Sequence, residues 1–504
     1  MGIRPALLGA IVALGLSGPA LAQKSADTLR VTWRDGIPVV DPYYNSLRIG
    51  LIVGHHVWDG LVARDPETFA VKPLLATAWN YVDPTTLEFT LRQGVVFHDG
   101  SKFTADDVVY TLNTLLTDKK LSVPSNYSWL AGAEKVDDFT VRVKLKRVFP
   151  AVLEYLAMVT PIWPKGYRER VGEDAYAKAP VAAGPYKITK IDGVHEIVLE
   201  RFEGYYQDSP KGRPAIRHLV IRSVTDSSAE ITALLGNKAD FIWNFPSDNF
   251  DNINRIPTLT ATRAESMRVG YLSIDAAGRT GADNPLTKLK VRQAIYHAID
   301  RKQIADKLVQ GGSRVPEAPC YPSQFGCDGA AAVDYPYDPA KARALLAEAG
   351  YPNGFDIELV TYILPQWGAS VQGYLNAVGI RARISQLQAS AAIQRSIEGK
   401  NPLYLGSWGS YSINDVSAGM PFFFTGGGDD YARDAELKTL VENGGSTTDP
   451  AERKRNYSAA IKRITEQAYW LPLHTYVTTY GLSKALDFTP FPDELPRFYL
   501  AKWK

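Results

Sequence analysis

Cysteine, net charge and long apolar runs are all scarce in this sequence. Its 504 residues include 2 cysteines and carry a formal net charge of +2. So small a charge argues against the clustered Lys and Arg face that nucleic-acid binding requires, so no nucleic-acid partner is expected. Beyond the N-terminus, no apolar run reaches the roughly 20 residues that a membrane-spanning helix needs. Hydrophobic residues make up 45% of the chain, as in soluble proteins, and the length predicts two or three compact units.

Enzyme motifs are also missing. The chain contains no HExxH helix, no Walker loop, no GxGxxG fingerprint and no GxSxG elbow. Of its seven histidines only His55 and His56 are adjacent, and neighbours in sequence do not face one metal ion. The carboxylate pairs Asp106–Asp107 and Asp429–Asp430 are better explained by a helix cap and a solvated loop. No catalytic site, metal or cofactor is therefore expected, although a secreted enzyme built from distant residues remains an alternative.

The N-terminus has the pattern of a secretory signal. Arg4 supplies a short positive region, residues 6–18 are apolar or small, and Ala20-Leu21-Ala22 forms a small-x-small cleavage site before Gln23. This pattern predicts a signal peptide over residues 1–22 and a soluble, periplasmic mature protein. No cysteine follows the apolar run, which argues against lipid attachment there. An uncleaved anchor is the alternative.

The two cysteines lie close together in a turn-rich segment. Cys320 and Cys327 flank YPSQFG, amid proline and glycine. A disulfide fits the oxidising compartment that the signal sequence predicts. A pair of metal-binding thiols is the other possibility, but it needs two further ligands and none lies nearby in the sequence.

Strand and helix patterns alternate along the chain, which predicts an α/β fold. Alternation of apolar and polar residues marks strands at residues 28–33, 87–91, 140–145, 197–201 and 218–223. Thr104 and Asp107 are spaced for a capping box at a helix start. Further helices are predicted at residues 291–299, where apolar residues recur with helical spacing, at 339–349 after Asp338-Pro339, and at 450–468 after Asp449-Pro450.

Four segments together resemble the peptide/nickel/opine class of solute-binding proteins of ABC transporters, also called family 5. They are LEFTLRQGVVFHDGSKFTADDVVYTL at 87–112, AAGPYKI at 182–188, VRQAIYHAIDR at 291–301 and KARALLAEAGYPNGF at 341–355. The segments follow the family's order and span nearly the whole mature chain. In this family the turn at His98 is a feature of the fold and not a catalytic site.

The resemblance implies a two-lobed periplasmic binding protein (class II, cluster C) with a third subdomain inserted in one lobe. Two chain crossings, near residues 268–273 and 478–482, would form the hinge, because a few residues can absorb the rotation of two rigid bodies. Lobe I would comprise residues 23–60, 184–268 and 481–504, the inserted subdomain residues 61–183, and lobe II residues 269–480.

The resemblance also implies a function. A monomeric receptor would capture a peptide or peptide-like solute between its lobes and deliver it to the permease subunits of an ABC importer. An opine or sugar-conjugate solute is an alternative ligand, and a sensing or chaperone role is an alternative use of the same fold.

The segment 404–420, YLGSWGSYSINDVSAGM, holds the first candidate ligand residues. In peptide-binding relatives a Trp here is followed three residues later by an Asp that holds the α-amino group. Trp408 matches that Trp, but Tyr411 stands at the Asp position and Asp415 is out of register. This mismatch argues against ordinary dipeptide binding and favours a longer peptide, a modified peptide, or an opine- or sugar-conjugate-like solute. Ser410 is a candidate as well, and core packing is the alternative for Trp408.

Other candidates come from the family's ligand-contacting regions. Trp129 resembles a tryptophan of the nickel-binding branch, but that branch's arginines and ligand histidine are not matched, so nickel is not expected. For each remaining candidate, plain packing is the alternative. These candidates are Tyr43 and Asn45 after Asp41-Pro42, Trp243 and Asn244 after a strand, Tyr271 at the first crossing, and Tyr362 at a strand end.

Overall fold

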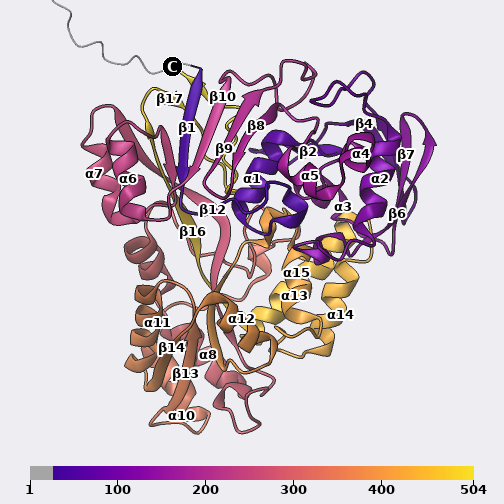
Figure 1. The fold of residues 1–504 in the computed structure, drawn as a ribbon. Coiled ribbons are helices and arrows are strands. Elements are labelled where there is room, and N and C mark those ends of the chain that lie inside the picture. The colour runs from indigo at the N-terminus through magenta and orange to yellow at the C-terminus, as the bar shows by residue number, and fades with distance from the viewer. Residues whose placement is uncertain (1–26) are drawn as a thin grey trace, which may run out of the picture.

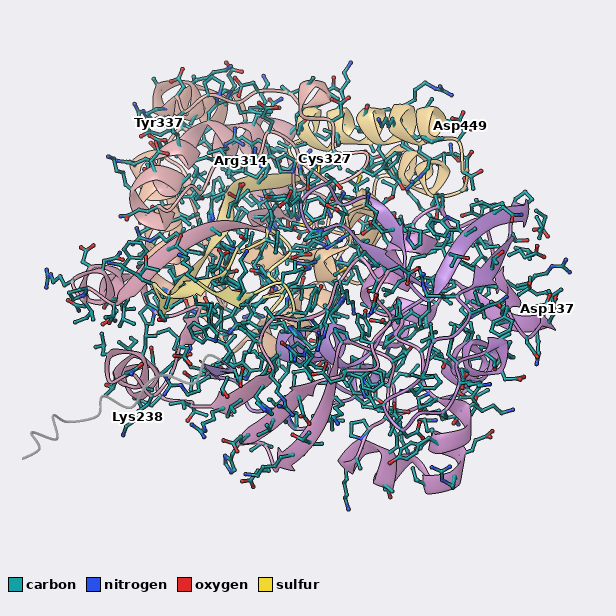
Figure 2. All side chains as sticks on the ribbon, turned by 90° about the horizontal axis from the view of Figure 1, so that it is seen from above. Asp137, Lys238, Arg314, Cys327, Tyr337 and Asp449 are labelled. Atoms are coloured by element: carbon teal, nitrogen blue, oxygen red, sulfur yellow. A yellow bond between two sulfur atoms is a disulfide. The ribbon has the colours of Figure 1, made fainter. Side chains whose placement is uncertain are left out.

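The computed structural model describes residues 27–504, and the predicted signal peptide lies outside that range. One 10-stranded sheet runs through both lobes in the order β14-β13-β15-β12-β16-β11-β1-β10-β9-β8. Three parts are distinct in Figure 1: an upper lobe around β1, a lower lobe around β13, and a lateral subdomain around β4 and β7. Asp137 lies at the outer edge of the subdomain and Lys238 at the outer edge of lobe I in the view from above (Figure 2). The α/β, two-lobed architecture is confirmed.

Two long strands connect the lobes. β12 (Leu259–Ile274) and β16 (Trp470–Ser483) pair antiparallel from Leu259 opposite Ser483 to Ser273 opposite Trp470. Both run from the upper lobe into the lower one (Figure 1). Their register shifts between Ser266 and Val269, and such a bulge bends a strand and redirects its side chains. The two-strand hinge is thus built from β12 and β16.

Lobe I is organised around β1 (Thr28–Trp33), which pairs parallel with β10 and β11. Leu29, Val31 and Trp33 alternate toward the core and are fully buried, as the sequence pattern predicts. The other elements of this lobe are α1 (Arg48–Val57), β8 (Tyr186–Asp192), β9 (Glu196–Arg201), β10 (His218–Ser223), α6 (Ser227–Leu235), β11 (Phe241–Trp243), α7 (Phe250–Asn254), β17 (Leu486–Asp487) and β18 (Lys502–Trp503).

The inserted subdomain carries a four-stranded antiparallel sheet in the order β4-β5-β7-β6. The predicted capping box is present, with Thr104 and Asp107 at the start of α2. The subdomain's elements are β2 (Val62–Arg64), β3 (Val71–Pro73), β4 (Ala76–Asp83), β5 (Thr86–Leu91), α2 (Ala105–Leu115), β6 (Leu130–Asp137), β7 (Thr140–Leu145), α3 (Val152–Met158), α4 (Lys165–Val171) and α5 (Glu173–Lys178).

Two of the family-like motifs pack on each other. The His98 backbone N–H donates to the Ala182 carbonyl, and the His98 ring nitrogen Nε2 lies 3.0 Å from the Gly184 carbonyl oxygen. A Cβ on Gly184 would lie 2.5 Å from the Val57 backbone, so only glycine fits there. His98 therefore fastens the subdomain to lobe I, in agreement with the structural role expected for it.

In lobe II, helices pack around the lower half of the sheet. The predicted helices are present, although the last ends at Glu466 instead of Ala468. Cys320 and Cys327 form the predicted disulfide. The lobe's elements are α8 (Leu289–Ala298), α9 (Arg301–Gln303), α10 (Pro339–Glu348), β13 (Phe355–Thr361), α11 (Pro365–Ala377), β14 (Ile380–Gln386), α12 (Ala389–Ile397), β15 (Leu403–Trp408), α13 (Met420–Phe424), α14 (Ala435–Gly444) and α15 (Pro450–Glu466).

Candidate functional site

A cleft of about 340 Å³ lies between the lobes, within the size range of small-molecule sites. One wall comes from the segment around α1 and from the subdomain, and the other from β12 and the segment after β15. The lining residues are Pro42, Tyr43, Asn45, Ser46, Leu47, Arg48, Leu51, Val123, Asn126, Tyr127, Val159, Arg268, Ile393, Ser407, Trp408, Gly409, Ser410 and Tyr411.

The charged residues that line this cleft are two arginines, Arg48 and Arg268, one from each wall. Both reach the same carboxylate oxygen, Oε2 of Glu494, at 3.3 Å and 3.4 Å. Charge-assisted hydrogen bonds are normally about 2.7–2.9 Å long, so this pairing is loose. Two guanidinium groups around one carboxylate leave one positive charge in excess at the edge of the cleft.

Burial and charge act against each other in this triad. Burial would raise the pKa of Glu494, but Arg268 and Arg48 outweigh it and hold that pKa below its usual value. Burial lowers the pKa of Arg48, and the positive charge of Arg268 adds to this effect. All three groups are charged at neutral pH, and a second carboxylate in the cleft would relieve the repulsion between the arginines.

Aromatic side chains form the lobe II wall of the cleft. Trp408 stacks on Phe422 with ring centroids 4.7 Å apart. Within the part of the chain that the structure describes, Trp408 Nε1 is buried and has no hydrogen-bond partner. Tyr411 is 43% exposed. The two rings offer flat apolar surfaces to a solute.

The residues that follow Trp408 adopt an unusual backbone. Ser410, Tyr411 and Ser412 have φ angles of 48°, 48° and 62°. This left-handed region costs non-glycine residues roughly 1–2 kcal/mol each, and such strain persists only where the surroundings hold it. Here Ser412 Oγ donates to the Asp493 carbonyl at 2.7 Å, and Gln324 Nε2 donates to the Ile413 carbonyl at 2.9 Å.

This turn is also where lobe II touches lobe I and the subdomain. Arg64 donates to the Ser412 carbonyl and pairs with Asp493 at 2.8 Å and with Glu154 at 2.9 Å. The Asn414 backbone N–H donates to Glu154 at 2.9 Å. Fixed polar contacts therefore join the lobes directly beside the cleft.

Residues 70–430 match the model of the bacterial extracellular solute-binding proteins, family 5 (middle part). The chain belongs to this family. The resemblance described from its four motifs is thereby confirmed.

Relatives of this family 5 protein span nearly its whole length. It is 28% identical over 495 residues to the glutathione-binding protein GsiB of Salmonella paratyphi A, with 92% of each chain covered, and 26% identical over 494 residues to GsiB of Escherichia coli K12, again with 92% covered. Its fold is similar to that of HbpA2 from Haemophilus parasuis (TM-score 0.81, 23% identity, 95% of this chain and 100% of the other) and to that of the ABC transporter substrate-binding protein CtaP from Listeria monocytogenes (TM-score 0.83, 22% identity, 95% and 100%).

Five of the candidates chosen from the sequence of this family 5 protein line the cleft: Tyr43, Asn45, Trp408, Ser410 and Tyr411. They do not contribute equally. Tyr43 is 1% exposed, and its hydroxyl already donates to the Pro161 carbonyl. Trp408 and Tyr411 are the candidates whose rings are available to a solute.

The other candidates do not line the cleft, and their part in ligand binding remains a prediction. Asp415 is buried in an ion pair with Arg453 at 2.8 Å. The Tyr362 hydroxyl donates a hydrogen bond to Ser407. Tyr271 stacks on Trp470, and Trp129 stacks on Phe149. Trp243 is buried, and the Asn244 carbonyl accepts a hydrogen bond from Arg34.

Arg48 and Arg268 were not among the candidates. Arg268 follows Ser266 within the β12 bulge, and nothing in the local sequence indicates that a strand shifts register there. Within residues 27–504, no group of three or more His, Cys, Asp or Glu is arranged to hold a metal ion, and no helix is long and apolar enough to cross a membrane.

Proposed function

We propose that this family 5 protein is the periplasmic receptor of an ABC importer and captures a small peptide-like solute that carries a free carboxylate. Residues 1–22 would be removed on export, and the lobes and subdomain would follow the boundaries expected from the sequence. The curated relatives named above are glutathione-binding proteins, which favours a peptide over an opine or a sugar conjugate.

The charge of the cleft lining is the observation that carries the choice of ligand. Arg48 and Arg268 line the cleft, and no Asp or Glu among the described residues does so. Tyr411 stands where peptide-binding relatives carry the Asp that holds an α-amino group. A ligand recognised through its carboxylate suits this lining, because arginine binds carboxylates with charge-assisted, often paired hydrogen bonds.

Lobe closure follows from where the cleft residues lie. Arg48 belongs to lobe I and Arg268 to the hinge strand, whereas Trp408 and Tyr411 belong to lobe II, so a solute that contacts the arginines and this lobe II wall would bind the closed form better than the open form. A ligand shifts such an equilibrium only through this difference in affinity, and a change from mostly open to mostly closed needs about 10⁴-fold. The aromatic wall at Trp408 would contribute apolar contact on the other side.

Ligand identification is the decisive experiment. Native mass spectrometry of the purified mature protein should reveal a co-purified solute. A thermal-shift screen with glutathione, other acidic di- and tripeptides, opines and sugar conjugates should then give a hit that raises Tm by mass action. The hit should remain chemically unchanged after long incubation. Turnover of the hit would instead support a secreted enzyme, and binding without uptake in the host would support a sensor.

A further inference from the structure

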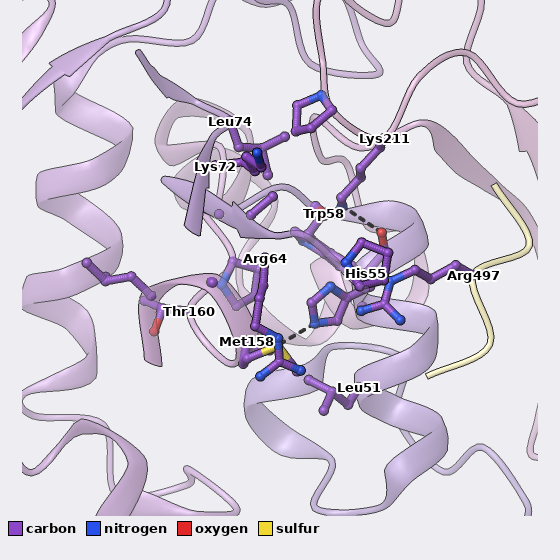
Figure 3. Close-up of a pocket in the computed structure, with 18 of the residues that line it drawn as sticks. Leu51, His55, Trp58, Arg64, Lys72, Leu74, Met158, Thr160, Lys211 and Arg497 are labelled. Carbon is purple, nitrogen blue, oxygen red and sulfur yellow. Dashed lines mark hydrogen bonds between the residues drawn. The ribbon is translucent and has the colours of Figure 1, made fainter. Parts of the chain in front are cut away.

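A second cavity, of about 330 Å³, lies within lobe I and its inserted subdomain. α1, the β2–β3 hairpin, α3, the loop at Lys211 and the C-terminal segment enclose it (Figure 3). Its walls are largely apolar, and their apolar members are Pro42, Leu51, Trp58, Ala63, Pro66, Leu74, Leu156, Ala157, Met158, Pro161, Pro210 and Leu500.

Charge is distributed unevenly about this cavity. Four cations line it, namely Arg64, Lys72, Lys211 and Arg497, together with one carboxylate, Asp65. Asp65 is already engaged, because its Oδ1 accepts hydrogen bonds from the backbone and hydroxyl of its own turn. The cavity lining therefore carries four cations against one carboxylate that is partly engaged.

The carboxylates that balance these cations lie behind the wall. Asp59 pairs with Lys211 at 2.7 Å, and Asp493 pairs with Arg497 at 2.6 Å; neither carboxylate is exposed or lines the cavity. Lys72 at the rim takes part in no ion pair within residues 27–504. A negative group inside the cavity would thus meet the positive ends of these pairs first.

Two side chains at the cavity wall, Arg64 and His55, each have a nitrogen atom that makes no hydrogen bond within the described residues. Arg64 has a side chain that is 1% exposed, and its Nε has no hydrogen-bond partner among the described residues. His55 Nε2 lies 3.0 Å from the Met158 carbonyl, so its proton is on Nε2 and its Nδ1 is an unprotonated acceptor. Burial, followed by the positive charges of Lys211 and Arg497, holds the pKa of His55 well below its usual value, so this side chain is neutral.

We propose that this lobe I cavity is a second ligand site, separate from the interlobe cleft, for a small organic anion with an apolar body. The apolar walls would hold the body. The anionic group would lie toward Lys72, Arg497 and the Nε of Arg64. An aromatic or aliphatic carboxylate or sulfonate has this chemistry.

The cavity and the cleft share two lining residues, Pro42 and Leu51, but they depend differently on whether the lobes are open or closed. The cleft has walls from both lobes, so its ligand binds best when the lobes are closed. Lobe I and its subdomain supply every residue that lines the cavity. Its ligand should therefore bind whether the lobes are open or closed, and it should not compete with a cleft ligand.

The test uses the full mature protein and 8-anilinonaphthalene-1-sulfonate, a fluorescent aryl sulfonate. We expect saturable binding to one site. Lys72→Glu, a change at an exposed rim residue, should weaken binding roughly threefold to tenfold by charge reversal. Ala157→Trp should abolish binding by filling the cavity. Lys238→Glu reverses an exposed lysine on the far side of lobe I and should leave binding unchanged.

Arg268→Ala separates the two sites, because it alters the cleft and not the cavity. Probe binding should survive this substitution. The proposal is overturned if no saturable site is found, if Lys72→Glu binds as tightly as the wild type, or if the site is lost in Arg268→Ala. The rim variant keeps the test valid even if Ala157→Trp does not fold.

Discussion

Arg48 Nη1 donates a hydrogen bond to Ser412 Oγ at 2.8 Å, and this contact joins lobe I to lobe II. The same guanidinium reaches Glu494 in the cleft triad. One side chain therefore takes part both in the contact between the lobes and in the candidate carboxylate site. The proposed ligand site and the contact between the lobes therefore share a residue.

Ser412→Ala should shift the ligand-free protein toward the open form. The substitution removes the Oγ bonds to Arg48 and to the Asp493 carbonyl, each contributing about 0.5–1.5 kcal/mol. Small-angle scattering should show a larger radius of gyration than in the wild type. Ser446→Ala, at an exposed serine before α15, is the matched control. Identical scattering from all three proteins would rule out a role for the Ser412 contact.

Tyr411→Gly should stabilise the fold, whereas Tyr411→Ala should not. The φ of 48° costs any residue with a Cβ roughly 1–2 kcal/mol, and glycine avoids this cost. Part of the gain is offset by the greater freedom of glycine in the unfolded chain, so we expect about 0.5–1 kcal/mol net. Denaturant unfolding of both variants measures the difference. Equal stability of the glycine and alanine variants would mean that the left-handed turn is not strained.

Arg268→Ala should weaken binding of a carboxylate ligand by about 10- to 100-fold. A hydrogen bond to a charged group contributes about 1.5–3 kcal/mol, and 1.4 kcal/mol corresponds to tenfold in Kd. Titration calorimetry with the solute identified above measures this loss. Arg381→Ala, at an exposed arginine paired with Asp356, should bind like the wild type. Undiminished affinity in Arg268→Ala would place the ligand elsewhere.

The contribution of Glu230 to stability should fall as pH rises from about 5 to 8. Its side chain is fully buried, and burial raises its pKa to about 8, with Arg34 at 3.8 Å offsetting only part of the effect. Since the folded pKa lies above the unfolded value, Glu230 binds more protons in the folded state over this range, so its contribution to stability is largest below pH 4.5 and is lost as Glu230 ionises.

Glu230→Gln should flatten this pH dependence. Between pH 5 and pH 8 the wild type should lose of the order of 2 kcal/mol more unfolding free energy than the variant does. Denaturant melts at the two pH values provide the comparison. A slope in the variant equal to that in the wild type would mean that Glu230 titrates normally.

Local patterns in the sequence predict the elements of this fold well. The strand at 28–33, the capping box of Thr104 and Asp107, and the disulfide between Cys320 and Cys327 are present as expected, because each depends on neighbours within a few residues. The helix at 450 ends two residues early because helix ends are weakly specified by sequence.

The candidate site is harder to read from sequence because its parts are far apart. Trp408 and Tyr411 follow from the family's motif, but Arg48, Arg268 and Glu494 come from three distant parts of the chain and meet only in the folded protein. From the sequence, Asp415 is a candidate for ligand binding, yet in the fold it forms an ion pair with Arg453. Long-range pairing of charges decides which of these residues face a solute.

Calorimetric titration with the identified solute and with its amidated twin, in which the free carboxylate is replaced by a neutral amide, tests the central claim most directly. Two arginines that hold a carboxylate in the interlobe cleft predict at least a roughly tenfold weaker Kd for the amide. An amide that binds as tightly as the acid would contradict the account.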